Sequence, residues 1–335
     1  MSLSLANVYR RLTGLLPLAA LLLAACGGGG NSESSAPPAS SERELSPVAI
    51  DPRVDTATEP HVAINPASGV AAADRLFVFL PGTEGTPSMY RYVLRVGAAR
   101  GYHAIGLSYP NDLPVGVLCA TGGDADCFWD VRREVITGSN FSGRIEISVP
   151  NAIDTRLALA LSYLAQNFPE EGWGRFVEGG VPVWSRIVVA GHSQGGGHAG
   201  VIAKLRPVQR AVYFAAPADW DSGADAPATW MSRAGQTPAD RQYGFGHLRD
   251  PLVPHDQVQR AWAALGLTAF GSATSVDGAA APYGGSHMLT TDAPPEIGLS
   301  ASPFHGAPVL DSVTPLTADR TAPLYAPVWS YLAFP

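Results

Sequence analysis

The sequence predicts an α/β fold with a mostly parallel, doubly wound sheet and helices on both faces. Three observations point to it. Short apolar segments recur along the chain, segments with helical periodicity lie between them, and the strand-like segments are apolar at nearly every position. Strands that alternate with helices form parallel sheets. Strands covered on both faces lose the polar alternation of half-exposed strands.

Six segments have the composition of buried strands and are bounded by turn residues. They are residues 75–82, 102–110, 185–191, 211–217, 241–247 and 274–278. Helices are predicted at residues 88–101, 151–168, 255–267 and 322–334. In the second of these, apolar side chains recur every three or four positions, at Ile153, Leu157, Leu161, Leu164 and Phe168. No internal repeat is found, so we predict a single folded domain at residues 48–335.

The amino terminus has the pattern of an export signal. Arg10 and Arg11 precede a short apolar run, and Leu-Ala-Ala stands directly before Cys26. The run is too short to span a membrane, so residues 1–25 are expected to be a signal peptide. A cysteine in this place resembles the lipobox of bacterial lipoproteins, which implies that Cys26 carries a lipid anchor. An ordinary signal peptide is the alternative.

The resemblance to lipoproteins also implies a location. More than one acyl chain gives a stable anchor, so we expect an exported protein held at a bacterial membrane without spanning it. Gly27 follows Cys26, which by analogy with enteric lipoproteins implies the outer membrane, at its periplasmic face or the cell surface, if the source has one. Residues 26–47 are rich in Gly, Ser, Pro and Glu and are predicted to be a flexible linker.

The charge of the chain disfavours one class of partner. The net charge is −7, and loss of residues 1–25, which hold two arginines and no acidic residue, takes it to −9. An acidic surface disfavours nucleic acid and electrostatic docking on membranes. We therefore expect contact with a membrane through the lipid anchor only.

Cys119 and Cys127 are the two other cysteines, and they stand eight positions apart. Cysteines of exported proteins are usually paired, and this spacing fits no common zinc site. We therefore predict a local disulfide, with two free buried thiols as the alternative.

The segment Gly191-His192-Ser193-Gln194-Gly195 fits the pattern Gly-x-Ser-x-Gly and lies between a predicted strand and a predicted helix. A serine at the tip of so tight a turn crowds the positions two before and two after it, which glycine tolerates best. Ser193 is therefore the candidate nucleophile. From about residue 48 onward the chain resembles the α/β-hydrolase superfamily, in particular secreted serine esterases and lipases, which implies a single-domain α/β-hydrolase fold.

That family has an acid downstream of the nucleophile, and the base follows the acid. The resemblance implies Asp250, just after the predicted strand at residues 241–247, as the acid. Asp219 and Asp221, after the preceding strand, are the alternatives. Asp256 is expected instead to be a helix-start residue.

For the base the resemblance implies His287, in a glycine-rich loop after the last predicted strand, with His305 as its competitor. His287 then takes the proton of Ser193 and returns it to the leaving group, while Asp250 orients the imidazole. His192 and His198 flank the serine and are expected to pack or to lie at the pocket rim. The only lysine lies about 16 Å along the predicted helix from the serine, which excludes a Ser-Lys dyad.

Two backbone N–H groups are expected to bind the oxyanion of the reaction. Gln194 starts a helix, where the N–H is free and the dipole favours negative charge. The second donor implied by the resemblance is Thr83, in the Pro-Gly-Thr segment at the end of the first predicted strand. An ordinary Gly-Pro turn is the alternative for that segment.

These residues predict a serine hydrolase that cleaves a carboxylic ester, small or polymeric, through an acyl-enzyme. The alternatives are the same triad acting on an amide, a thioester or a polyester, and a binding lipoprotein that has lost catalysis. The sequence has no metal-binding or phosphate-binding motif, so no metal and no cofactor are expected.

Overall fold

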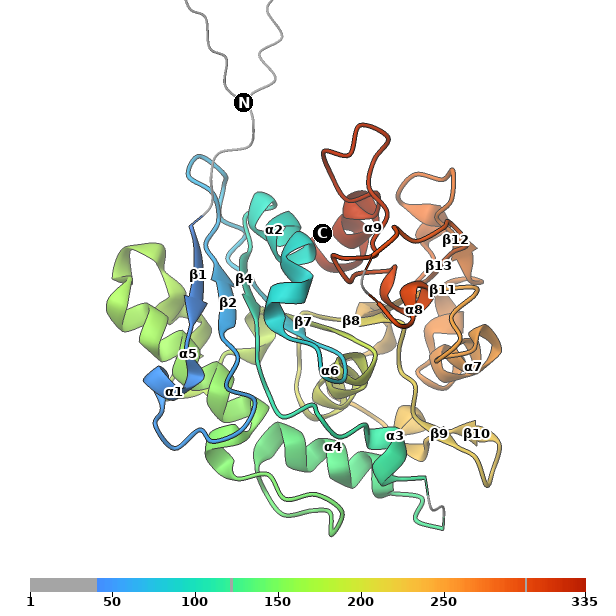
Figure 1. The fold of residues 1–335 in the computed structure, drawn as a ribbon, viewed down its shortest axis with the longest axis horizontal. Coiled ribbons are helices and arrows are strands. Elements are labelled where there is room, and N and C mark those ends of the chain that lie inside the picture. The colour runs from blue at the N-terminus through green and yellow to red at the C-terminus, as the bar shows by residue number, and fades with distance from the viewer. Residues whose placement is uncertain (1–40, 121–122, 299) are drawn as a thin grey trace, which may run out of the picture. The chain divides into compact units, whose positions relative to one another are not determined.

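The computed structural model describes residues 41–120, 123–298 and 300–335 of the chain (Figure 1). The predicted signal peptide at residues 1–25 and the predicted lipid attachment at Cys26 lie outside the described residues, so both stay predictions. Among the helices of the described ranges, none is long and apolar enough to cross a membrane.

A nine-stranded sheet forms the centre of the described chain, in the order β1-β2-β4-β3-β7-β8-β11-β13-β12. Its strands are β1 (Glu42–Leu45), β2 (His61–Ile64), β3 (Leu76–Leu80), β4 (His103–Gly106), β7 (Ile187–His192), β8 (Arg210–Phe214), β11 (Gln242–His247), β12 (Thr274–Ser275) and β13 (Met288–Thr291). The pairs β1 with β2 and β2 with β4 are antiparallel, and the remaining pairs are parallel. In Figure 1, β1 and β2 lie at one edge of the sheet, and β12 and β13 lie at the other.

Two short hairpins lie outside this sheet, and helices cover both of its faces. The hairpins are β5 (Val177–Glu178) with β6 (Val181–Pro182) and β9 (Trp220–Asp221) with β10 (Ala226–Pro227). The helices are α1 (Pro47–Ile50), α2 (Arg91–Ala99), α3 (Val115–Leu118), α4 (Cys127–Thr137), α5 (Ile153–Asn167), α6 (Gln194–Leu205), α7 (His255–Ala264), α8 (Pro303–Gly306) and α9 (Ala326–Ala333).

The two cores divide the side chains of each central strand between them. Along β3, Leu76, Val78 and Leu80 belong to the core with α4, α5, α6 and α7, whereas Phe77 and Phe79 belong to the core with α2 and α9. Successive side chains of a strand point to opposite faces, and here both faces are buried. The strands are therefore apolar at nearly every position, and the predicted α/β class, a mostly parallel doubly wound sheet flanked by helices, is confirmed.

The six predicted strands are present as β3, β4, β7, β8, β11 and β12, and the four predicted helices are present as α2, α5, α7 and α9. The spacing in residues 151–168 does bury one face of α5, with Ile153, Leu157, Leu161 and Leu164 inaccessible to solvent. Within the nine-stranded sheet, the sequence pattern misses β1, β2 and β13. Each has only four residues and lacks the longer apolar run that marks the segment around β4.

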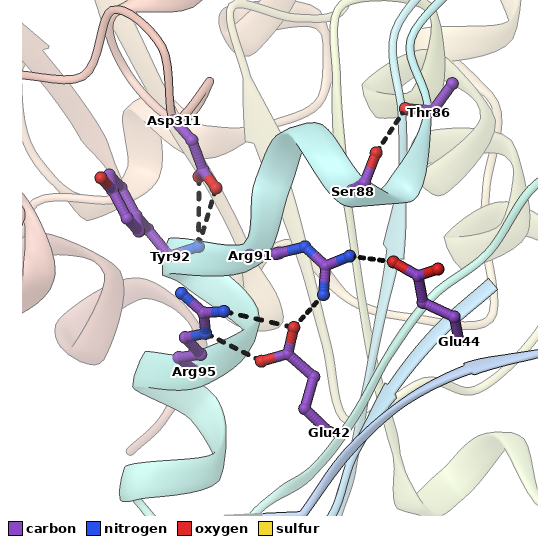
Figure 2. Close-up of polar contacts among 8 residues, drawn as sticks. All are labelled: Glu42, Glu44, Thr86, Ser88, Arg91, Tyr92, Arg95 and Asp311. Carbon is purple, nitrogen blue, oxygen red and sulfur yellow. Dashed lines mark hydrogen bonds and ion pairs between the residues drawn. The ribbon is translucent and has the colours of Figure 1, made fainter. Parts of the chain in front are cut away.

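The folded part begins earlier than predicted. The sequence predicts a flexible linker up to residue 47, but Glu42–Leu45 form β1 and Pro47–Ile50 form α1. Arg91 of α2 lies between Glu42 and Glu44 and forms ion pairs with both (Figure 2). Arg95 bonds the same Glu42 at 2.8 Å. These glutamates therefore pair with a distant helix, which the polar composition of the segment does not reveal.

The amino end of α2 is also held from the opposite end of the chain. The carboxylate of Asp311 accepts a hydrogen bond from the N–H of Tyr92, with Oδ1 at 3.1 Å (Figure 2). The N–H of Asp311 donates to the carbonyl of Met89 at 3.0 Å. The first N–H groups of a helix have no partner inside it, so Asp311 caps α2 from 219 positions away.

Replacement of Asp311 by asparagine tests this cap. Burial raises the pKa of Asp311 to about 7, although the N–H groups of Tyr92 and Arg91 and the charges of Arg95 and Arg91 act in the opposite direction. Between about pH 4 and pH 7 the native state keeps a proton that the unfolded chain has lost, so this carboxyl lowers the free energy of unfolding as the pH rises. Asparagine still accepts the N–H but does not titrate.

We expect Asp311→Asn to gain about 1–3 kcal/mol in the free energy of unfolding, relative to the parent, between pH 5 and pH 8. Urea unfolding at several pH values measures it. Asp112→Asn, at an exposed position, is the control and should show no such trend. A parent-to-variant difference that is constant with pH contradicts the prediction.

Candidate active site

Ser193 stands where β7 ends and α6 begins. Its φ of +52° and ψ of −117° lie where residues other than glycine are rarely found, a conformation that costs on the order of 1–3 kcal/mol. The N–H of Ser193 donates to the carbonyl of Phe214 in β8 at 2.9 Å, and the N–H of Gly197 donates to the carbonyl of Ser193 at 3.2 Å. The sheet and the first helical turn thus hold the serine backbone from both sides.

Close contacts explain the glycines around this serine. A Cβ on Gly195 would lie 2.0 Å from the carbonyl oxygen of Leu80 at the end of β3, and a Cβ on Gly191 would lie 2.2 Å from the carbonyl carbon of Gly195. A Cβ on Gly197 would lie 2.2 Å from the guanidinium of Arg132 in α4. Glycine inside a helix costs about 1 kcal/mol relative to alanine. Here it allows α6 to approach both β3 and α4.

Asp250 follows β11 and pairs with His305 of α8. Nδ1 of His305 lies 2.7 Å from Oδ2 of Asp250, and both side chains are buried. Oδ1 of Asp250 accepts the N–H groups of Leu252 at 2.8 Å and Val253 at 3.1 Å. Burial alone would raise the pKa of Asp250, but the hydrogen bond and charge of His305, with these two N–H groups, outweigh burial and hold that pKa below its usual range. An ionised carboxylate therefore fixes the orientation of the imidazole.

The structure does not bring His287 to Asp250. His287 precedes β13, its carbonyl accepts the N–H of Gly244, and its Nδ1 lies 2.9 Å from the carbonyl oxygen of Gln242 at the start of β11. Because β11 and β13 run parallel, His287 lies at the amino edge of the sheet, whereas Asp250 follows the carboxyl end of β11. A strand of four residues separates these edges by about 13 Å.

The misplacement of His287 has a simple cause. The sequence prediction treats the segment around His287 as a loop after the last strand, but Met288–Thr291 form β13. The loop at the carboxyl edge is the one that follows β13, and it leads to His305. The side chain of His287 instead stacks between Tyr243 and Phe270, with ring centroids 3.9 Å and 4.1 Å away.

Asp219, an alternative acid, forms a buried ion pair with Arg132. Its Oδ2 lies 2.6 Å from Nε of Arg132, and Nε1 of Trp230 donates to the same oxygen at 2.8 Å. Nη1 of Arg132 donates in turn to the main-chain carbonyl of Gln194 at 2.8 Å. Asp221, the other alternative, accepts N–H groups of its own turn. Neither carboxylate is bonded to a histidine in the described chain.

The two expected oxyanion donors lie next to each other. Oγ1 of Thr83 donates to Oε1 of Gln194 at 3.1 Å, and the N–H of Val115 donates to the same oxygen at 3.1 Å. Gln194 is the first residue of α6, so its N–H has no acceptor within the helix. Among the described residues, the N–H of Thr83 also has no hydrogen-bond acceptor. Both N–H groups are therefore free to bind a ligand.

The loop that carries Thr83 is held by residues that the sequence analysis does not single out. Nδ2 of Asn111 donates to the carbonyls of Gly82 at 2.6 Å and Gly85 at 2.9 Å, and the hydroxyl of Tyr109 donates to the carbonyl of Pro81 at 2.7 Å. These bonds turn the carbonyl groups of the loop toward the segment after β4. In sequence, Pro-Asn-Asp at residues 110–112 is typical of an ordinary turn, so no local signal marks Asn111.

Ser193 and His305 line the same cavity, which has a volume of about 480 Å³. Apolar side chains form much of its wall, namely Met89, Pro114, Leu252 and Leu310. Met89 and Leu252 are exposed. None of the described lining residues comes from residues 219–241, so that segment does not cover the cavity. Within the described ranges, no group of three or more His, Cys, Asp or Glu side chains is placed to hold a metal ion.

The predicted disulfide between Cys119 and Cys127 is confirmed. It joins the end of α3 to the start of α4. Helix α3 supplies Val115, which bonds the side chain of Gln194, and α4 supplies Arg132, which bonds its carbonyl. The disulfide therefore links two segments that both contact the first residue of α6.

Comparison with known proteins finds similarity at the level of solved structures only. No protein-family model matches the chain, and no curated protein matches it. Similar solved structures include native esterase Est2 of the Planctomycetes species Thermogutta terrifontis, at 16% identity and a TM-score of 0.38, covering 74% of this chain and 80% of that chain. The same esterase phosphoramylated by tabun is similar at 15% identity and a TM-score of 0.39, covering 75% and 82%. These values are too low for either structure to indicate an activity for this chain.

Alanine at position 195 tests the packing of the serine turn. The added Cβ meets main-chain atoms of β3, which have no room to move, so we expect Gly195→Ala to lose about 3 kcal/mol or more in the free energy of unfolding, or to yield no soluble protein. Thermal unfolding followed by circular dichroism measures it. Gly116→Ala is the control, since a Cβ there meets no atom within 4 Å. Equal stability of the two variants would refute the packing argument.

Proposed function

We propose that the chain is a serine hydrolase that cleaves carboxylic esters, with Ser193 as nucleophile, His305 as base and Asp250 as the residue that orients the base. The observation that carries this proposal is the 2.7 Å hydrogen bond from His305 to Asp250. His305 lines the same cavity as Ser193, whose backbone is strained. A serine, a histidine and a carboxylate in these roles are the known requirements for acyl transfer. His305 thus takes the role that the sequence analysis assigns to His287.

In the first half of the proposed reaction, Oγ of Ser193 attacks the ester carbonyl carbon and its proton passes to Nε2 of His305. Nδ1 keeps its proton and donates a hydrogen bond to the carboxylate of Asp250, which stabilises the imidazolium. The N–H groups of Thr83 and Gln194 bind the oxyanion, a contribution of about 3–4 kcal/mol per donor in comparable sites. The C–O bond then breaks, and the leaving alcohol takes the proton from His305.

In the second half, water attacks the acyl carbon attached to Ser193. His305 takes a proton from this water, the oxyanion forms again, and the bond to Oγ breaks. The proton then passes from His305 to Oγ, and the carboxylic acid leaves. The same groups therefore serve both halves, and the reaction needs no cofactor.

We propose that the preferred substrates have an apolar acyl or alcohol portion and that bulky or polymeric esters are accepted. The apolar wall and the exposed side chains of Met89 and Leu252 support this substrate class. Lack of cover from residues 219–241 leaves room for a chain that extends past the cavity. A series of p-nitrophenyl esters of increasing acyl length, tested beside a polyester film, distinguishes small from polymeric substrates.

We further propose that the protein works outside the cytoplasm, attached to a bacterial membrane through lipid on Cys26. The pattern of residues 1–26 supports this location, and so does the disulfide, since such bonds persist in oxidising compartments. Replacement of Cys26 by serine should release the protein from the membrane fraction, and metabolic labelling with a fatty acid should be lost.

Two histidine variants distinguish the proposed base from the one predicted from the sequence. We expect His305→Ala to lower kcat for p-nitrophenyl butyrate by about 10³-fold or more, because the proposed acceptor of the serine proton is lost. Ser193→Ala should abolish labelling by a fluorophosphonate probe. His287→Gln is the matched control and should keep kcat within about twofold. Loss of activity in His287→Gln with activity retained in His305→Ala would reverse the assignment.

Removal of the disulfide should affect the reaction more than the fold. The closed loop is short, so Cys119→Ser with Cys127→Ser should cost about 2.5 kcal/mol or less in the free energy of unfolding. We expect kcat/KM to fall several-fold, because α3 and α4 both contact Gln194. A reductant should lower kcat/KM of the parent by the same factor and leave kcat/KM of the double variant unchanged. An unchanged kcat/KM with a large fall in Tm would contradict this.

A further inference from the structure

We propose that Tyr90 and His192 are positioning residues, which set the catalytic base and the oxyanion loop at a fixed distance through one chain of hydrogen bonds. The inference rests on the proposed function and assigns a role to two side chains that the reaction itself does not use. The series of hydrogen bonds begins at Gly82 in the loop that carries Thr83, passes through the side chains of Tyr90 and His192, and ends at the main-chain carbonyl of His305. It therefore connects the loop of a proposed oxyanion donor to the proposed base.

The direction of each hydrogen bond follows from the partners. The N–H of Gly82 donates to the hydroxyl oxygen of Tyr90 at 3.3 Å. Nε2 of His192 lies 3.0 Å from the carbonyl oxygen of His305, which can only accept, so Nε2 carries the proton. Nδ1 of His192 is then an acceptor, and the hydroxyl of Tyr90 donates to it at 3.0 Å. Each of the three donors therefore has one acceptor, and the hydroxyl of Tyr90 both accepts from Gly82 and donates to His192.

Burial keeps His192 in one protonation state at and around neutral pH. His192 and Tyr90 are both buried. Burial, followed by the effect of the neighbouring His305, lowers the pKa of His192 to about 3. The imidazole of His192 is therefore neutral at ordinary pH and cannot itself serve as a general base near neutrality. Its two nitrogens are also both occupied, in agreement with a positioning role.

The chain is packed as well as bonded. A Cβ on Gly82 would lie 3.0 Å from Nδ1 of His192, so the oxyanion loop rests directly on this ring. On the other side, the ring centroids of His192 and His305 are 4.7 Å apart. His192 directly precedes Ser193 in sequence, so its ring fixes the positions of Gly82 and His305 relative to the proposed nucleophile. An error of about 1 Å in the position of a reacting group can cost 10²-fold in rate.

Kinetics of four variants with p-nitrophenyl butyrate test the proposal. We expect His192→Leu to lower kcat about 100-fold with KM changed by less than about threefold, because the base is misplaced while the apolar wall is intact. The glutamine of His192→Gln can place its amide nitrogen near the position of Nε2 and donate to the carbonyl of His305. Its kcat should therefore be about tenfold higher than that of His192→Leu. Tyr90→Phe leaves Gly82 without an acceptor and should lower kcat about tenfold.

The matched control is His103→Leu. His103 is also buried and also bonds a main-chain carbonyl through Nε2, that of Glu171 at 2.7 Å, but it lies in β4 and does not line the cavity. This variant should lose stability comparable to that lost by His192→Leu and keep kcat within about twofold. Thermal unfolding of every variant separates loss of folded protein from loss of rate.

The outcomes distinguish failure of the proposed function from failure of the positioning role. A parent protein that neither hydrolyses esters nor reacts with a fluorophosphonate overturns the proposed function. An active, labelled parent whose His192→Leu and Tyr90→Phe variants both keep the parental kcat overturns the positioning role alone. If His192→Leu does not fold, a parental kcat in Tyr90→Phe overturns it. Equal losses in His192→Leu and His192→Gln, matched by His103→Leu, assign the effect to packing and also overturn it. Loss in His192→Leu with recovery in His192→Gln supports the proposal.

Discussion

The approach of α6 to the end of β3 is the constraint on which the whole site depends. Gly195 lies so close to the carbonyl of Leu80 that no side chain fits between them. This contact determines where the first turn of α6 begins, and so it determines the backbone conformation of Ser193. A positive φ at a serine is unfavourable by itself. It persists because the sheet on one side and the helix on the other leave no alternative.

Polar contacts surround this close backbone approach, and many of them converge on Gln194, the first residue of α6. The side chain of Gln194 joins Thr83 to Val115, while its carbonyl receives Arg132, which is itself paired with Asp219. A buried ion pair contributes little net stability once desolvation is counted. Its value here is geometric, since it holds α4 against the glycines of α6. The buried polar contacts thus gather around Gln194, whose backbone N–H is a proposed oxyanion donor.

The sequence was sufficient for features whose evidence is local. The glycines around Ser193 reveal a crowded turn, two nearby cysteines reveal a disulfide, and the place of Asp250 follows from a recognisable strand before it. The proposed base could not be found in this way, because the choice between His287 and His305 depends on whether residues 288–291 form a strand. Four residues carry too weak a pattern, and their pairing with β11 is visible only in three dimensions. The roles of Asn111 and Tyr90 are equally non-local.

The pairing of β3 with β7 also governs when this site comes into being. Thr83 and Gln194, which meet beside the serine, are 111 positions apart in the chain. Contacts that close such long loops form late in folding, because the entropy of closure is lost before the contact is made. The turn at Ser193 therefore meets Thr83 only after β3 and β7 have paired. The geometry of the candidate site depends on the completed sheet and is absent from the partly folded chain.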